Sequence, residues 1–226
     1  MSHNSFFAKF LRFIGIMLMA LTGGFTLLAG IGTSCAALFP AKWESMAPLA
    51  PFQWLYILFV LTGIAIGVWG IRATVKLVKG TSDSYEMSLQ ALVTGGVVGF
   101  IHIYASRALR GKSMPVDAVV YTTILTLIVF LLFRIPGIWQ GVNFDKGGSN
   151  RTAGGAAAII LGALTLTIQY TMGSTHTWGG VNYADAFNLG MTLVGIGLLL
   201  LGAGILVGVD RIRGWLKQTE VQTRGA

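Results

Sequence analysis

The sequence predicts an all-α protein: a polytopic integral membrane protein built as a six-helix transmembrane bundle, with both termini in the cytoplasm. Only 11% of the 226 residues are charged, whereas an ordinary soluble domain is about 25% charged. Mean hydropathy is +0.72, and apolar stretches of spanning length, about 20 residues, recur along the chain. The polar stretches between them are short, so we expect a single transmembrane domain over residues 1–226.

Proline and glycine separate the expected spans. Pro40, Pro48 and Pro51 follow the first apolar stretch, while Gly80 and Gly111 follow the second and third. Both residue types interrupt regular helices, so these positions predict loops. The expected spans are residues 11–39, 52–77, 87–106, 116–139, 153–173 and 188–209.

The third span is the least apolar, and the distribution of basic residues tests whether it crosses. With six spans and a cytoplasmic N-terminus, twelve of the 16 Lys and Arg residues fall inside, and only Lys42, Arg107, Arg110 and Lys112 fall outside. Without a crossing at residues 87–106 the count becomes eight against eight. The positive-inside rule therefore favours six crossings. A re-entrant third segment stays open, because three of those four residues form a basic outer loop.

The N-terminal segment shares some features with a targeting signal. Lys9 and Arg12 precede an apolar stretch that ends at residues 32–37, a pattern loosely similar to a signal or lipoprotein cleavage site. The stretch is longer than the 7 to 15 residues of a typical signal core, and Gly32 stands where a lipoprotein site needs a branched aliphatic residue. We therefore expect an uncleaved first span, in a multi-pass protein of a bacterial cytoplasmic (inner) membrane.

Glycine is the most distinctive component, with 31 residues. GxxxG pairs and seven-residue glycine spacings place a smooth strip on one helix face, where two backbones can approach closely. One interpretation is packing within the chain, and the other is an interface between chains, for which the last span is the best candidate. The glycines that we expect in helix packing are Gly63, Gly67, Gly95, Gly99, Gly197, Gly204 and Gly208.

Arg134 is the one charged residue well inside an apolar stretch, and it lies five residues before Trp139. An arginine side chain can reach the membrane surface over that distance, so an anchor beside a proline-bent helix end is one interpretation. The other is an anion or lipid-headgroup site at the cytoplasmic mouth of the bundle.

Five polar residues map to the outer side of the predicted topology and form a possible outer polar cluster. Imidazole, thiolate and carboxylate groups that converge can hold a metal or relay protons. None of these residues has the i, i+3 or i, i+4 spacing of a helical metal site, so we expect no metal. The cluster comprises Cys35, His102, Asp117, His176 and Asp185.

Several functional classes are excluded or disfavoured. The net charge of +8 belongs to loops beside the membrane, not to a polar domain able to grip a nucleic acid. One cysteine rules out an intrachain disulfide. No HExxH or GxSxG motif occurs, and we expect neither a catalytic residue nor a cofactor, although a single axial haem ligand stays open.

Function is therefore inferred largely from what is missing. The leading hypothesis is a non-catalytic membrane component, an accessory subunit or homo-oligomer, whose partners are the lipid bilayer and other membrane subunits or copies of itself. The second is a channel or carrier for a small neutral or anionic solute. A membrane enzyme that uses the outer His and Asp residues ranks third.

Overall fold

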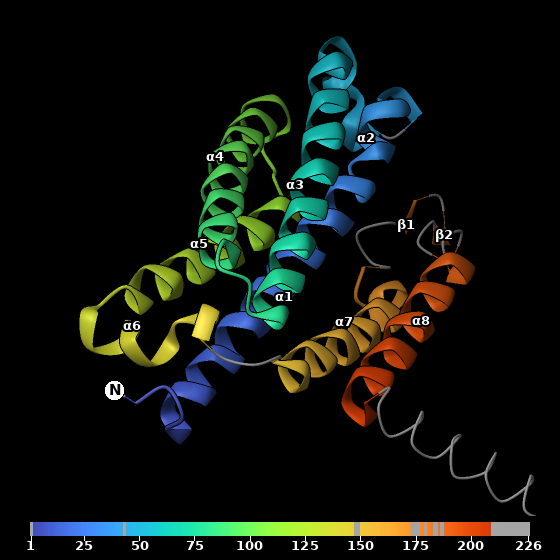
Figure 1. Ribbon diagram of the computed structural model, residues 1–226. Helices are drawn as coiled ribbons and strands as arrows, with labels where there is room; N and C mark the ends of the chain where they lie inside the picture. Colours follow the sequence, from blue (N-terminus) through green and yellow to red (C-terminus); the bar gives the residue numbers. More distant parts are fainter. Residues whose placement is uncertain are drawn as a thin grey trace, which may run out of the picture. The chain divides into compact units, whose positions relative to one another are not determined.

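The computed structural model describes residues 2–42, 44–146, 150–172, 177–178, 180–182, 185 and 188–208 (Figure 1). The described residues are almost entirely helical and include six helices long and apolar enough to cross a membrane, which confirms the all-α class. The elements are α1 (Phe6–Gly32), α2 (Ser34–Leu38), η1 (Pro40–Lys42), η2 (Glu44–Phe52), α3 (Gln53–Lys79), α4 (Ser84–Arg110), α5 (Val116–Phe133), α6 (Pro136–Val142), η3 (Phe144–Lys146), α7 (Arg151–Met172), β1 (Thr177–Trp178), β2 (Val181–Asn182) and α8 (Asn188–Val207).

The chain divides into two compact units, Met1–Asn150 and Arg151–Ala226. Unit 1 contains α1 to α6, and unit 2 contains α7, α8 and the antiparallel pair of two-residue strands. A single transmembrane domain over the whole chain stays a prediction.

Unit 1 is a ring of four long helices. Helix α1 packs on α3, α3 on α4, α4 on α5, and α5 back on α1, and successive helices run in opposite directions (Figure 1). We call its two ends the α2 end, which also carries η1 and η2, and the α6 end, which also carries the N-terminus. Left-handed glycines stop two of the helices, Gly80 after α3 and Gly111 after α4, with φ of 71° and 70°, a conformation that favours glycine. The sequence correctly predicted both breaks.

The third expected span is one continuous helix. Helix α4 has 27 residues, and at 1.5 Å per residue it is about 40 Å long, more than the 30 Å of a bilayer core. The polar residues that make it doubtful in the sequence do not interrupt it. Its length and composition suffice for a crossing, while the crossing itself stays a prediction.

The fourth expected span, 116–139, is shorter in the structure. Helix α5 ends at Phe133 and the separate short helix α6 begins at Pro136. Proline has no N–H to donate and disfavours a helical conformation in the preceding residue, and Ile135 adopts ψ of 124°. Arg134 therefore caps the end of a helix and does not lie inside one.

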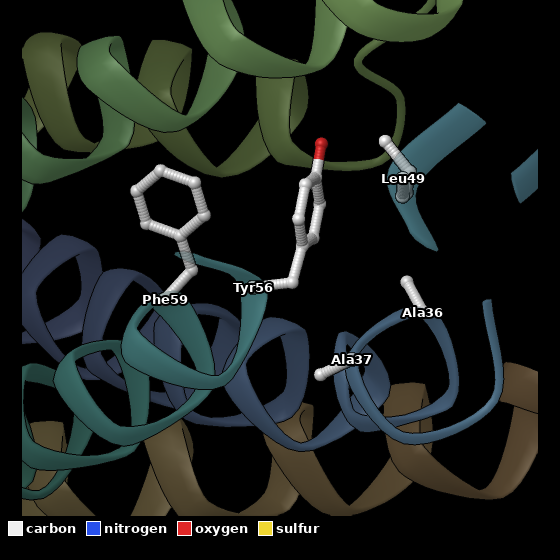
Figure 2. Close-up of a cluster of buried hydrophobic side chains, with 5 residues drawn as sticks. All are labelled: Ala36, Ala37, Leu49, Tyr56 and Phe59. Carbon is white, nitrogen blue, oxygen red and sulfur yellow. The ribbon is translucent and has the colours of Figure 1, made fainter. Parts of the chain in front are cut away.

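An apolar cluster closes the α2 end of unit 1 (Figure 2). Helix α2 contributes Ala36 and Ala37, η2 contributes Leu49, and α3 contributes Tyr56 and Phe59. In Figure 2 the Tyr56 ring stands between Phe59 and Leu49, and its hydroxyl points away from α2. That hydroxyl shares a buried 2.8 Å hydrogen bond with the Ser106 hydroxyl of α4. Small residues on α2 thus let this short helix pack closely against α3.

Both units contain an antiparallel helix pair held by glycines seven residues apart. In unit 1, Gly23 of α1 opposes Gly70 of α3 and Gly30 opposes Gly63. In unit 2, Gly155 and Gly162 of α7 oppose Gly202 and Gly195 of α8. Each of the second four glycines lies 132 positions after its counterpart in the first four: Gly23, Gly30, Gly63 and Gly70. The two hairpins therefore use the same packing register.

Candidate functional site

The interior of unit 1 carries a line of small polar side chains. Thr22 of α1 and Thr126 of α5 share a buried 2.8 Å hydrogen bond. Thr126 also donates to the carbonyl of Thr122, and Thr26 donates to the carbonyl of Thr22. Hydroxyls bonded to their own helix are satisfied without a partner helix, so they tolerate membrane depth and keep oxygen lone pairs free to accept.

His102 of α4 lies at the α2 end of this interior and is only 9% exposed. Its ring stacks on Phe59 with centroids 4.2 Å apart, and Tyr56 meets it edge-on at 5.6 Å. Among the described residues, no hydrogen bond forms to either ring nitrogen. The His102 nitrogens are not among the fully buried unpaired atoms of the described residues, which are Arg12 Nε, Ser84 Oγ and Arg110 Nε, so they keep access to space beside the ring.

Two small cavities lie along the axis between α1, α3, α4 and α5. The larger is about 50 Å³ and has His102 in its wall; the smaller is about 10 Å³. Thr26, Ile66 and Gly95 line both, so the cavities adjoin. The cavity walls are otherwise largely apolar and contain no acidic or basic side chain besides His102.

The four expected packing glycines of unit 1 all lie at helix contacts. A Cβ at Gly67 would stand 2.6 Å from the Leu27 backbone of α1, and one at Gly63 would stand 3.1 Å from Gly30. A Cβ at Gly95 would approach a methyl of Ile66, and one at Gly99 would overlap Val120. The glycine pair on α3 therefore packs against α1. On α4, Gly95 packs against α3 and Gly99 packs against α5.

The expected packing glycines of α8 behave differently. No described atom lies within 4 Å of a Cβ placed at Gly197 or Gly204. The third, Gly208, lies just past the helix with φ of 79° and belongs to its termination. The glycines that face α7 are instead Gly195 and Gly202. The sequence shows both seven-residue series, but only the structure separates them by face.

Arg134 packs on aromatic rings at the α6 end. Its guanidinium carbon lies 5.0 Å from the ring centre of Tyr85 and 4.8 Å from that of Trp139. Tyr85 donates a 2.6 Å hydrogen bond to the carbonyl of Phe130. A guanidinium over two such rings gains cation–π attraction, which accords with the anchor interpretation. An anion would have to bind at the edge of the guanidinium, while the two aromatic rings keep their contacts with it.

Three members of the possible outer polar cluster, Cys35, His102 and Asp117, lie in unit 1. Asp117 accepts 2.5 Å hydrogen bonds from Arg107 and Ser113, which links the end of α4 to the start of α5. Among the described residues, no group of three or more His, Cys, Asp or Glu side chains lies close enough to hold a metal. Asp185 belongs to unit 2, and His176 lies outside the described residues.

Arg12 is a buried residue that sequence reasoning missed. It is 4% exposed and donates to the carbonyls of Gly141, at 2.6 Å, and His3, at 3.1 Å. His3 in turn contacts the carbonyl of Asn143 through its ring nitrogen. In the sequence Arg12 is one of two basic residues at the start of the first apolar stretch. No local pattern distinguishes it, because Gly141, the acceptor of its shorter hydrogen bond, lies 129 residues away in the chain.

Six helices of spanning length, joined by short connections and bearing apolar exposed faces, are those of a multi-pass membrane protein. Comparison with protein-family models, curated proteins and solved structures gives no match. Functional inference therefore rests on the geometry of the two units.

Proposed function

We propose that the protein is a non-catalytic component of a membrane assembly, an accessory subunit or homo-oligomer that packs through helix α8. The observation that carries this proposal is the open glycine series on α8. A Cβ added at Gly195 or Gly202 would meet α7. One added at Gly190, Gly197 or Gly204 would have no described atom within 4 Å. One helix thus has two close-packing strips, and one of them is used within the described chain.

The open strip has the composition of a helix interface in a bilayer. Leu193 and Leu200, on the same face, are 64% and 69% exposed. Because lipid tails are as apolar as leucine, helices associate in membranes by close packing, and small residues mark where backbones can approach. A leucine placed at the centre of this strip would hold a second helix away.

Gly197→Leu and Gly204→Leu test this directly, with Ala203→Leu as the matched control on another exposed face of α8. Native mass spectrometry in mild detergent should show wild-type protein as an oligomer or with a bound subunit. Both glycine variants should dissociate, and the control should not. Recovery of wild type as a lone monomer, or an unchanged mass for the glycine variants, would reject the proposal.

We further propose the orientation inferred from charge, with both termini inside a bacterial cytoplasmic (inner) membrane. In a Cys35→Ala background, a cysteine at exposed Lys112 should react with an impermeant maleimide added outside whole cells. A cysteine at exposed Gln140 should react only after permeabilisation. The reverse pattern would invert the topology, and labelling of both positions from outside would remove the fourth crossing.

The second candidate function is a channel or carrier for a small neutral or anionic solute. The adjoining cavities of unit 1 support a neutral solute, because the walls include threonines and one histidine but no other ionisable group. Arg134 supports an anionic one, as an exposed cationic group at the α6 end. Flux of water, ammonia or nitrate in proteoliposomes above that of empty liposomes tests this function.

A further inference from the structure

The larger cavity of unit 1 has room for molecules of the size of water. A cavity needs about 10–15 Å³ for each water centre, and this one measures about 50 Å³. Four of the residues that line it are glycines, Gly30, Gly63, Gly95 and Gly99. The adjoining cavity of about 10 Å³ stands at the lower limit for one further molecule.

The polar atoms in the wall define what such a molecule must do. Thr26 and Thr33 donate their hydroxyl protons to the carbonyls of Thr22 and Ala29, so toward a guest their oxygens can only accept. A neutral His102 ring has one nitrogen that donates and one that accepts. A guest that satisfies both kinds of group must therefore donate and accept hydrogen bonds.

Burial makes an unfilled site unfavourable. A polar group with little access to solvent is unfavourable without a partner, and His102, which is 9% exposed, has no hydrogen-bond partner among the described residues. The Phe59 and Tyr56 rings pack against the imidazole ring of His102, but they form no hydrogen bond with its nitrogens. With no carboxylate or ammonium in the wall, the site offers nothing to neutralise an ion.

We propose that this cavity binds a neutral, water-sized molecule that both donates and accepts hydrogen bonds, water or ammonia, between His102, Thr26 of α1 and Thr33, which caps α1. This site is independent of the packing role of α8. If the second candidate function is correct, this molecule is the transported substrate. Binding in the cavity does not depend on that function; only transport does.

The test uses the full chain, labelled with ¹⁵N-histidine and reconstituted in lipid bilayers, with solid-state NMR transfer of magnetisation from water to the imidazole nitrogens. His102→Phe assigns the signal. We expect rapid transfer to His102, several-fold slower transfer in Thr33→Val and Gly95→Ala, and unchanged transfer in the controls Thr62→Val and Gly96→Ala. Thr62 likewise donates to its own helix, and a Cβ at Gly96 meets no described atom.

Absence of transfer to His102 while His3 receives it would overturn the proposal, as would binding of xenon in the cavity, because dry apolar cavities take up xenon. Added ¹⁵N-ammonia distinguishes the two guests: a contact to His102 identifies ammonia, and a contact from water alone identifies water. Stopped-flow flux measurements on the same liposomes separate site from transport. Transfer without flux rejects the channel and keeps the site.

Discussion

Gly67→Ala tests whether the α1–α3 interface depends on backbone contact. The added Cβ would lie 2.6 Å from both the Cα and the N of Leu27, whereas ordinary contact begins at 3.4 Å. The difference, 3.4 minus 2.6 Å, requires the two backbones to separate by about 0.8 Å near this point. No side-chain rotation can relieve the overlap, because the opposing atoms belong to the main chain.

The expected cost follows from that displacement. A gap of 0.5–1 Å removes about a quarter to a half of the dispersion attraction between facing atoms, and overpacking typically costs about 1–3 kcal/mol. Alanine also favours a helix over glycine by about 1 kcal/mol. Gly96→Ala gains the same propensity without a clash within 4 Å, so the difference between the two variants isolates the steric cost, about 1–3 kcal/mol.

Cys35 provides the assay, since it is the only cysteine and lies half-buried in α2, which packs on α3. A thiol-reactive dye should report its exposure as detergent-solubilised protein is heated. For a chain of this size each kcal/mol corresponds to about 2–4 °C, and Gly67→Ala should melt below Gly96→Ala accordingly. Equal melting temperatures, or a higher one for Gly67→Ala, would refute the close approach of the helices.

Three further predictions concern the α6 end. Arg12→Gln should lower the melting temperature by the equivalent of about 1.5–3 kcal/mol, the value of a charge-assisted hydrogen bond, whereas loss of exposed Lys9 should not. Arg134→Ala should cost about 0.5–1 kcal/mol per aromatic ring lost, with Arg134→Lys intermediate in the same melting assay. The hydrogen bond from Lys76 lowers the pKa of the exposed Asp83 below its ordinary 3.8. Stabilisation by this pair is therefore present above that value and disappears as pH falls through the lowered pKa, so wild type and Asp83→Asn should differ in melting temperature at neutral pH and converge in acid.

Features that depend on local chemistry were predictable from the sequence. Apolar length identified all six long helices, and Gly80 and Gly111 identified two helix ends, because a left-handed conformation after a helix favours glycine. The end of α5 was misplaced because apolar composition continues through Pro136 to Trp139, although proline stops the helix. Apolar composition predicts which residues lie within the membrane, whereas the backbone conformation that proline imposes determines where the helix ends.

Features that depend on which helices meet were not predictable. The GxxxG pattern identified Gly63 and Gly67 as packing residues, but nothing in the sequence showed that Gly23 and Gly30 oppose this helix. Arg12 and the cavity beside His102 likewise arise from contacts between distant segments. Spacing along one helix defines a face, and the partner of that face follows only from the fold.

The shared glycine register of the two hairpins has a consequence for how the chain is made. Each register joins helices that are consecutive spans, so its contacts can form as soon as the second helix of the hairpin has left the ribosome. Helices α1 and α3 can therefore pair before α4 has left the ribosome, and α7 and α8 can pair in the same way once both have emerged. Biogenesis can therefore proceed hairpin by hairpin, with the glycines setting the depth at which each arriving helix stops relative to the one before it.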